Sequence, residues 1–503
     1  MNFKNLFVFF FLLFSCYVGA QSPTKIELIH ADFLEGNEEF GKDVRRLIGN
    51  VQFKHDSALM YCDSAYLFAI TNSLDAFGHV RILQGDTISL TGDLLKYDGN
   101  TKTARMFDNI IFRDRKMTLT TQTLNYNLAT EVAEYINGGK IVDEENVLVS
   151  SSGNYLSKEK KLLFRDSVVL TNPRYVMNTD TLHYFTLTKT AFFYGPCTIT
   201  STGKDSSVIY CENGWYNTTT EKSYFGKNAW LKSKEQKLWG DSLLYDRKNG
   251  IGRAFGNVNI KDSVQKVIIS GDTGYYDELK QKSFVTGKTL LTQLLDDDSL
   301  FMHADTLFAT NDTVSKNKTY FAYHSVKLFK SDLQGACDSL VYNSSDSTVR
   351  LFSLPILWSD KNQMTADSIY IQLANNKIDK LLLKDAAFMT SYEDSARYNQ
   401  VKGKTMMGFF ENNELYKIDV NGNGQSIYYG RNKKKQLTGV NRAECSNMEI
   451  FVKESKVSRI KMIEKPEATF YPIKELQPNE LILKGFSWQE DRRPLRKEDI
   501  FLN

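Results

Sequence analysis

One short pattern recurs along most of this chain at intervals of about 30 residues. The segment GDSLLYDRKNGIGRAFGNVNIKD, from Gly240 to Asp262, contains both halves of the pattern, and DAFGHVRIL, from Asp75 to Leu83, repeats the second half. With Val258 as the reference, the equivalent residues are Val51, Val80, Ile110, Val168, Cys197, Ala229, Val326 and Ile356. Self-similarity at this spacing is typical of proteins built from stacked repeats.

The first half of the pattern usually begins with an aspartate. The copies begin at Asp63, Asp93, Asp180, Asp241, Asp272, Asp305, Asp338 and Asp367. A catalytic carboxylate pair occurs once in a protein, whereas these aspartates recur from repeat to repeat. We therefore interpret them as structural residues at strand starts, where Asp side chains accept hydrogen bonds from nearby backbone groups.

Both halves alternate between inward and outward residues with period two, which indicates β-strands. Leu243 and Tyr245 share one face of their segment, Val258 and Ile260 share one face of theirs, and Asn249-Gly250 marks a hairpin between them. Open sheets rarely exceed about 10 strands, so alternate strands are expected in two sheets that share their apolar faces. The predicted fold is all-β: an elongated jellyroll, or taco, of two facing antiparallel sheets made from about a dozen two-strand repeats of ~30 residues.

The N-terminus has the pattern of an export signal, with Lys4, an apolar run over residues 6–14 and small residues at 18–20. We predict a signal peptide at 1–20, a repetitive jellyroll at 21–400 and a less regular continuation of the β structure at 401–503. A second interpretation has Cys16 lipid-anchored, since LFSC at 13–16 resembles a lipobox. No later stretch approaches the roughly 20 apolar residues of a transmembrane helix.

Composition and motifs argue against several classes of function. A net charge of +3 lacks the basic excess of a nucleic-acid-binding protein. The six histidines show no metal-ligand spacing, and there is no nucleophile elbow, phosphate loop or Cys-x-x-Cys motif. We therefore predict no enzymatic activity, no cofactor, no metal site and no nucleic-acid partner. An odd number of widely spaced cysteines favours buried free thiols at Cys62, Cys197, Cys211, Cys337 and Cys445.

The motifs D-x-L-x-Y-D and A-x-x-x-G-N-V-x-I resemble the OstA-like, LptA-like family of lipopolysaccharide-transport proteins. The resemblance is carried by residues 46–53, 75–98 and 240–262. It implies a periplasmic β-jellyroll, open along one side, that carries lipid A acyl chains towards the outer membrane. It also implies pairing of edge strands with other jellyroll proteins of a transport bridge, or head-to-tail association of copies, in association with the outer membrane.

The resemblance and the shared strand face together predict which side chains would line a lipid-binding slot. Exposing an acyl chain to water costs about 0.8 kcal/mol of free energy per CH₂ group. A carrier therefore needs a continuous apolar path. The predicted residues are Val51, Phe53, Val80, Ile82, Leu95, Tyr97, Val168, Leu170, Leu243, Tyr245, Val258 and Ile260.

Two other interpretations of the same pattern remain open. The sheets of a β-sandwich usually close on a filled core, and the protein would then be a structural envelope scaffold or an adhesin. A carbohydrate-active enzyme on a stacked β-fold is the other, although no acidic cluster is localised to one groove.

Overall fold

The structure is a computed structural model that describes residues 24–502, except for 37–42, 116, 144, 204–206, 234, 296–297, 316, 376, 395–396, 412–413, 433, 435, 454–455 and 473–476. The predicted signal peptide and Cys16 lie outside the described residues. The described residues form two compact units: those up to Pro173 with Thr181–Leu187, and Arg174–Asp180 with those from Thr188 onwards.

The first unit consists of strands that pair antiparallel, mostly with the next strand along the chain. They are β1 (Glu27–His30), β2 (Phe33–Glu35), β3 (Val44–His55), β4 (Ala58–Phe68), β5 (Ser73–Gln84), β6 (Ile88–Asp98), β7 (Thr103–Asp114), β8 (Met117–Asn127), β9 (Val132–Tyr135), β10 (Gly139–Asp143), β11 (Asn146–Ser150), β12 (Ser152–Leu156) and β13 (Lys161–Asn172). Strand β14 (Tyr175–Phe185) contributes residues to both units.

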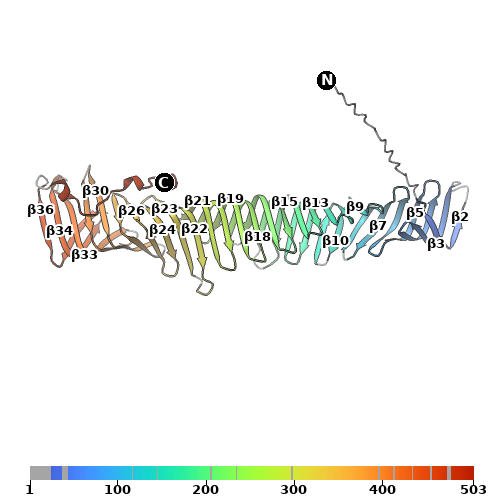
Figure 1. Ribbon diagram of the computed structural model, residues 1–503, viewed down its shortest axis with the longest axis horizontal. Helices are drawn as coiled ribbons and strands as arrows, with labels where there is room; N and C mark the ends of the chain where they lie inside the picture. The colour runs from blue at the N-terminus through green and yellow to red at the C-terminus, as the bar shows by residue number, and fades with distance from the viewer. Residues whose placement is uncertain are drawn as a thin grey trace, which may run out of the picture. The chain divides into compact units, whose positions relative to one another are not determined.

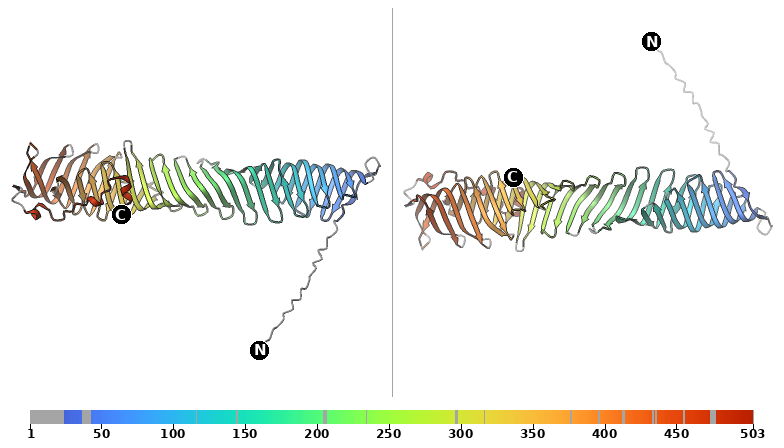
Figure 2. Two further views of the ribbon diagram at one scale, coloured as in Figure 1. Left: turned by 90° about the horizontal axis from the view of Figure 1, so that it is seen from above. Right: turned by 90° about the horizontal axis from the view of Figure 1, so that it is seen from below.

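The second unit follows the same antiparallel succession, which can be traced from β15 to β24 in Figure 1 and from two further sides in Figure 2. Its strands are β15 (Thr190–Ser201), β16 (Val208–Asn217), β17 (Lys222–Lys232), β18 (Gln236–Asp246), β19 (Ile251–Asp262), β20 (Val267–Asp277), β21 (Lys282–Leu294), β22 (Ser299–Asn311), β23 (Lys318–Lys330), β24 (Leu333–Asn343), β25 (Thr348–Phe352), β26 (Ile356–Ser359), β27 (Asn362–Thr365), β28 (Ser368–Ala374), β29 (Lys377–Lys384), β30 (Phe388–Asp394), β31 (Arg397–Lys402), β32 (Thr405–Glu411), β33 (Glu414–Arg431), β34 (Leu437–Lys453), β35 (Lys456–Ile463) and β36 (Glu467–Tyr471). The short 3₁₀ segments η2 (Pro478–Leu481), η3 (Glu490–Arg492) and η4 (Lys497–Phe501) follow.

The long strands bend near their middle, where the pairing register shifts. In β19 the bend lies at Gly256 and Asn257, which have φ of 67° and 48°. The Asn257 side-chain amide donates to both carboxylate oxygens of Asp241 on β18, each at 3.1 Å. A Cβ at Gly256 would lie 2.1 Å from Oδ2 of Asp241, so both the backbone angle and the space require glycine.

Most of the recurring aspartates therefore do not stand at strand starts; Asp367, which directly precedes β28, is the exception. Asp63 lies in the middle of β4 and Asp241 in the middle of β18, each beside the bend of the following strand. Asp63 pairs with His79 at 2.8 Å, and Asp93 accepts from Asn109 at 2.6 Å. The aspartates are structural, as predicted, but they fix a bend in the neighbouring strand rather than a turn.

The bends fold each sheet into two leaves. In the first unit, leaf A contains the half-strand Val44–Ile48 and its neighbours, and leaf B contains Val51–His55 and its neighbours. In the second unit, leaf A likewise contains residues 251–255 of β19 and their neighbours, and leaf B contains residues 258–262 and theirs. His55, at the far end of leaf B, lies 2.6 Å from the hydroxyl of Tyr97, at the far end of leaf A. Strands rise about 3.3 Å per residue, so in a flat sheet these strand ends would be tens of ångströms apart. The two leaves must therefore face each other.

These observations confirm an all-β fold of two facing antiparallel sheets. The strands are longer than the sequence pattern suggested, since β19 has 12 residues and β20 has 11. Alternate strands were expected to enter different sheets. Instead, each long strand passes through both leaves, because its midpoint bend lets one strand supply both apolar faces.

The C-terminal residues 477–502, here called the strap, run back over the outer face of leaf B in the second unit. Gln400 donates to the carbonyl of Leu481 at 2.9 Å and accepts from the amide of Leu483 at 2.9 Å. Further along, Arg493 donates to the side-chain oxygen of Gln334. The last described residue of the strap, Leu502, lies beside β23, where its carbonyl accepts a hydrogen bond from Lys327. This end of the ribbon can be found near β23 in Figure 1.

Candidate functional site

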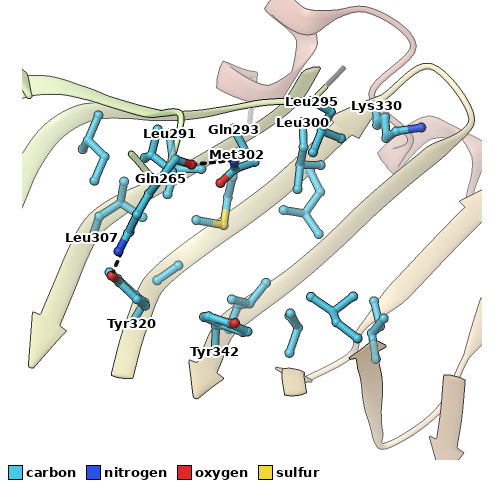
Figure 3. Close-up of a pocket in the computed structure, with 18 of the residues that line it drawn as sticks. Gln265, Leu291, Gln293, Leu295, Leu300, Met302, Leu307, Tyr320, Lys330 and Tyr342 are labelled. Carbon is cyan, nitrogen blue, oxygen red and sulfur yellow. Dashed lines mark hydrogen bonds between the residues drawn. The ribbon is translucent and has the colours of Figure 1, made fainter. Parts of the chain in front are cut away.

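The second unit encloses a cavity of about 3760 Å³ that is lined by both leaves. In the part drawn in Figure 3, Leu291, Leu300 and Met302 line it from leaf B, and Tyr320 and Tyr342 face them from leaf A. Small-molecule sites usually measure roughly 300–1,000 Å³. The cavity is therefore large enough for a guest with several long chains.

The floor of the cavity and much of its wall are apolar. Near the bend, Met302 and Leu307 are almost buried, with 9% and 7% of their surface exposed. Leu300 is half-buried, and Leu295, at the hairpin end of leaf B, is exposed. Alternation with period two places Leu300 and Met302 on one face of β22, so the same pattern that builds the sheet also builds the apolar wall.

The interior of the first unit is filled instead. Phe53 and Tyr97 are at most 2% exposed, as are Phe112 and Tyr126. Phe112 packs against Tyr126 with ring centroids 5.6 Å apart. These large side chains fill the space between the two leaves, as in an ordinary β-sandwich core.

Polar pairs also close the mouth between the leaves of the first unit. Each pair joins a tyrosine hydroxyl from leaf A to a side chain at the far end of leaf B, and the pairs recur from repeat to repeat. Burial and the hydrogen bond to Asp114 raise the pKa of Tyr155 to about 12, so this hydroxyl keeps its proton and donates. The pairs are His55 with Tyr97 at 2.6 Å, Gln84 with Tyr126 at 2.7 Å, and Asp114 with Tyr155.

The equivalent tyrosine of the second unit does not close the mouth in this way. Tyr245 occupies the place of Tyr97 in the D-x-L-x-Y-D motif, but its hydroxyl donates to Glu278, at the leaf A hairpin after β20, at 3.2 Å. Tyr320 does reach across to Gln265 of leaf B, over a longer distance of 3.4 Å (Figure 3). The leaves thus stand apart along the cavity.

Part of the cavity volume is present because two glycines stand where the first unit has leucines. Gly252 on β19 and Gly274 on β20 both line the cavity. The repeat pattern makes them equivalent to Leu74 and Leu95 of the first unit, which are fully buried. A Cβ on Gly252 would have its nearest neighbour at 3.8 Å, so the room for a larger side chain is present and unused.

The predicted slot residues divide between the two units. Leu243, Tyr245 and Ile260 line the cavity of the second unit, whereas Val258 is buried close to the bend and is not one of the lining residues. The predicted residues of the first unit belong to its interior and do not line this cavity; Leu170 is half-buried and the others are buried. Those residues are Val51, Phe53, Val80, Ile82, Leu95, Tyr97, Val168 and Leu170.

Sequence reasoning did not identify the lining residues of the later repeats. Leu291, Leu300, Met302 and Leu307 occupy the same strand face as the predicted residues. Their alternation was visible in the sequence. A more useful indication of a cavity in the sequence is the replacement of an interior leucine by glycine at Gly252 and Gly274.

The mouth of the cavity carries charges of both signs. Lys330 lies 2.6 Å from Asp332 and 3.8 Å from Asp298, and all three line the cavity. Lys266 and Glu278 also contribute to the lining. An amphiphile with its chains inside would meet ionic groups of both signs at the rim.

A smaller hollow, of about 730 Å³, lies on the outer face of leaf A in the first unit and is lined mainly by polar side chains such as Arg105 and Glu134. Over the described residues, no group of three or more His, Cys, Asp or Glu side chains could hold a metal ion. No helix among those residues has the length and apolar character needed to cross a membrane.

All five described cysteines are buried, and none is bonded to another in the structure, which agrees with the prediction of buried thiols. Cys62, Cys337 and Cys445 face Val51, Val326 and Gly424 across their ladders. Cys197 and Cys211, however, are directly opposite each other on β15 and β16.

Comparison with known proteins matches residues 23–180 to the OstA-like protein family. Nearly all the residues that line the cavity follow this segment. Among solved structures, the chain is similar to LptH, the LptA-homologous periplasmic component of the lipopolysaccharide transport device of Pseudomonas aeruginosa. The match has 17% identity and a TM-score of 0.21, and covers 22% of this chain and 82% of that one. No curated protein matches the chain.

Proposed function

Because residues 23–180 form an OstA-like segment, we propose that this chain is a non-enzymatic lipid-carrying bridge protein that moves lipopolysaccharide across the periplasm. The acyl chains of lipid A would travel in the cavity of the second unit, with the sugar and phosphate groups at its mouth.

The single observation that carries this proposal is the apolar cavity of about 3760 Å³. Each CH₂ moved from water to an apolar wall gains about 0.8 kcal/mol, so a long chain gains much more than a small polar ligand could. Similar side chains recur on neighbouring strands along one wall, as Ile260, Ile269 and Leu291 do in leaf B. Near-equivalent positions let a guest shift from one to the next without a deep energy trap.

The filled interior of the first unit supports a second role for that part of the chain. With Phe53 and Tyr97 packed between closed leaves, it has the properties of a structural scaffold. We propose that the first unit acts as a structural scaffold and as a docking element for partner proteins, and that the second unit carries the lipid.

Partners would join at the edge strands. Over the described residues, β35 and β36 pair only with β34, and β1 and β2 pair only with β3. Unpaired strand edges favour addition of a strand from another chain. We propose pairing with other jellyroll proteins of a transport bridge or with a second copy of this chain, in the periplasm or at the outer membrane, with Cys16 as a candidate lipid anchor.

The test is to purify the full chain from its host envelope and identify the bound lipid by mass spectrometry. A double variant, Gly252→Leu with Gly274→Leu, installs the leucines of the first unit and narrows the cavity at one level. We expect lipopolysaccharide bound to the native chain and several-fold less on this variant, because a leucine side chain occupies the volume that the guest needs.

The matched control is Thr273→Leu, which adds a leucine beside Gly274 on the opposite strand face. It should retain the bound lipid. Circular dichroism must show that both variants fold. Absence of lipopolysaccharide from the native chain, or equal amounts on all three proteins, would contradict the proposal.

A further inference from the structure

The chain contains one pair of cysteines whose strand positions bring them together. Cys197 lies on β15 and Cys211 on β16, and the two residues are direct partners in the antiparallel ladder. Opposed residues in such a ladder have Cα atoms about 4.5–5.5 Å apart. Disulfides span Cα distances of roughly 4.4–6.8 Å, so the backbone needs no large movement to allow a bond.

The other cysteines provide an internal comparison. The repeat places the residue before the bend aspartate opposite the valine that follows the bend of the preceding strand, as in Cys62 with Val51 and Cys337 with Val326. Only between β15 and β16 do cysteines occupy both members of such a pair in the described ladders. In this repeat, Cys197 replaces the usual valine.

We propose that Cys197 and Cys211 form a structural disulfide when the protein folds in an oxidising compartment. The bond would join the leaf B halves of β15 and β16 next to the bend. There, the register shift between Tyr194 and Cys197 interrupts the ladder, and Pro196 has no N–H to donate. A disulfide at this point would hold the two strands together where the bend interrupts their backbone hydrogen bonds.

The reaction is a thiol–disulfide exchange. The two S–H bonds are lost, one S–S bond forms, and two electrons pass to the disulfide of an exchange partner such as oxidised glutathione, which leaves as two thiols. Both cysteines are at most 1% exposed. The hydrogen bond with Cys211, together with burial, raises the pKa of the Cys197 thiol, so exchange is slow once the leaves have closed. The bond must form while the strands are still accessible.

The test is peptide mapping after alkylation of free thiols. Trypsin cuts after Lys189, Lys204 and Lys222, which separates Cys197 in residues 190–204 from Cys211 in residues 205–222. The full chain is purified from the envelope, and a second sample is reduced, unfolded and refolded in a mixture of oxidised and reduced glutathione. We expect the two peptides as one linked species, lighter than their sum by two hydrogen atoms, that separates on reduction.

Two variants sharpen the result. Cys197→Val restores the residue of the other repeats, and should fold normally and give Cys211 as an alkylated peptide. Cys62→Ala should retain the linked pair. Recovery of both peptides fully alkylated from both native samples, or linkage of either cysteine to Cys62, Cys337 or Cys445, would overturn the proposal. The outcome does not depend on which lipid the cavity carries.

Discussion

In several repeats, the bend combines two adjacent residues in the left-handed backbone region with one acidic side chain beside them. In β19 these are Gly256, Asn257 and Asp241. A side chain in the left-handed region costs about 1–2 kcal/mol per residue, unless it is glycine or a short polar residue. The G-N dipeptide of the repeat is therefore a bending device, and the aspartate opposite it holds the bend in place.

We expect Gly256→Ala to destabilise the second unit by about 1–2 kcal/mol from backbone strain, and more from the contact with Asp241. The matched control is Gly252→Ala on the same strand, where φ is not positive and the nearest atom to the new Cβ is at 3.8 Å. Chemical denaturation followed by circular dichroism gives the comparison. Equal midpoints for the two variants would show that the bend does not need glycine.

The bend at Gly78 and His79 should depend on pH. The hydrogen bond and charge of Asp63 raise the pKa of His79 above its ordinary value of about 6.5. The histidine thus contributes stability that is fully present below the unfolded pKa and is lost as the pH rises through the folded pKa. NMR titration should show the raised pKa, and Asp63→Asn should return it to the ordinary value. An unchanged titration in that variant would exclude the pair as the cause.

At the scale of elements, buried glutamines attach the strap to leaf B. Gln363 donates to the carbonyl of Ser487 at 2.6 Å and accepts from the amide of Gln489 at 2.8 Å. Gln400 binds Leu481 and Leu483 in the same two-bonded manner. A glutamine amide used in this way provides the same donor and acceptor as a strand residue, so the strap is held without forming a regular strand.

We expect Gln363→Ala to loosen the strap, because buried backbone groups left without partners cost about 1–3 kcal/mol. Hydrogen exchange at residues 481–493 should become faster. Gln372→Ala on β28, where the side chain is exposed, is the matched control and should leave exchange there unchanged. If both variants exchange like the native chain, the glutamines do not hold the strap.

The strands could be predicted from the sequence, and the strap could not. Alternation in segments such as residues 251–262 gives both the strand and its inward face, since period two follows directly from strand geometry. The bend at Gly256 requires knowledge that the aspartate lies on the neighbouring strand, not in the nearest turn. Strap docking depends on pairs such as Gln363 with Ser487, which are 124 residues apart, and no local pattern encodes them.

At the scale of whole units, one repeat pattern produces two different interiors. Val51 and Val258 are equivalent in sequence and both are buried. Yet one unit closes on aromatic side chains such as Phe112, while the other retains a cavity beside Gly252 and Gly274. The pattern of apolar and polar residues fixes which side chains face inward. Whether the inward side chains of the two leaves come into contact depends on their summed volume and on the polar pairs at the mouth. The pattern does not specify either of these.

The central claim, that the interior of the second unit holds acyl chains, is tested most directly by a photo-reactive phenylalanine placed at Leu291 and, separately, at Leu290. These neighbouring leucines lie on opposite faces of β21, and only Leu291 lines the cavity. After irradiation in living cells, we predict that position 291 captures lipopolysaccharide and position 290 does not. Equal capture at both positions, or none at position 291 in a folded chain, would contradict the claim.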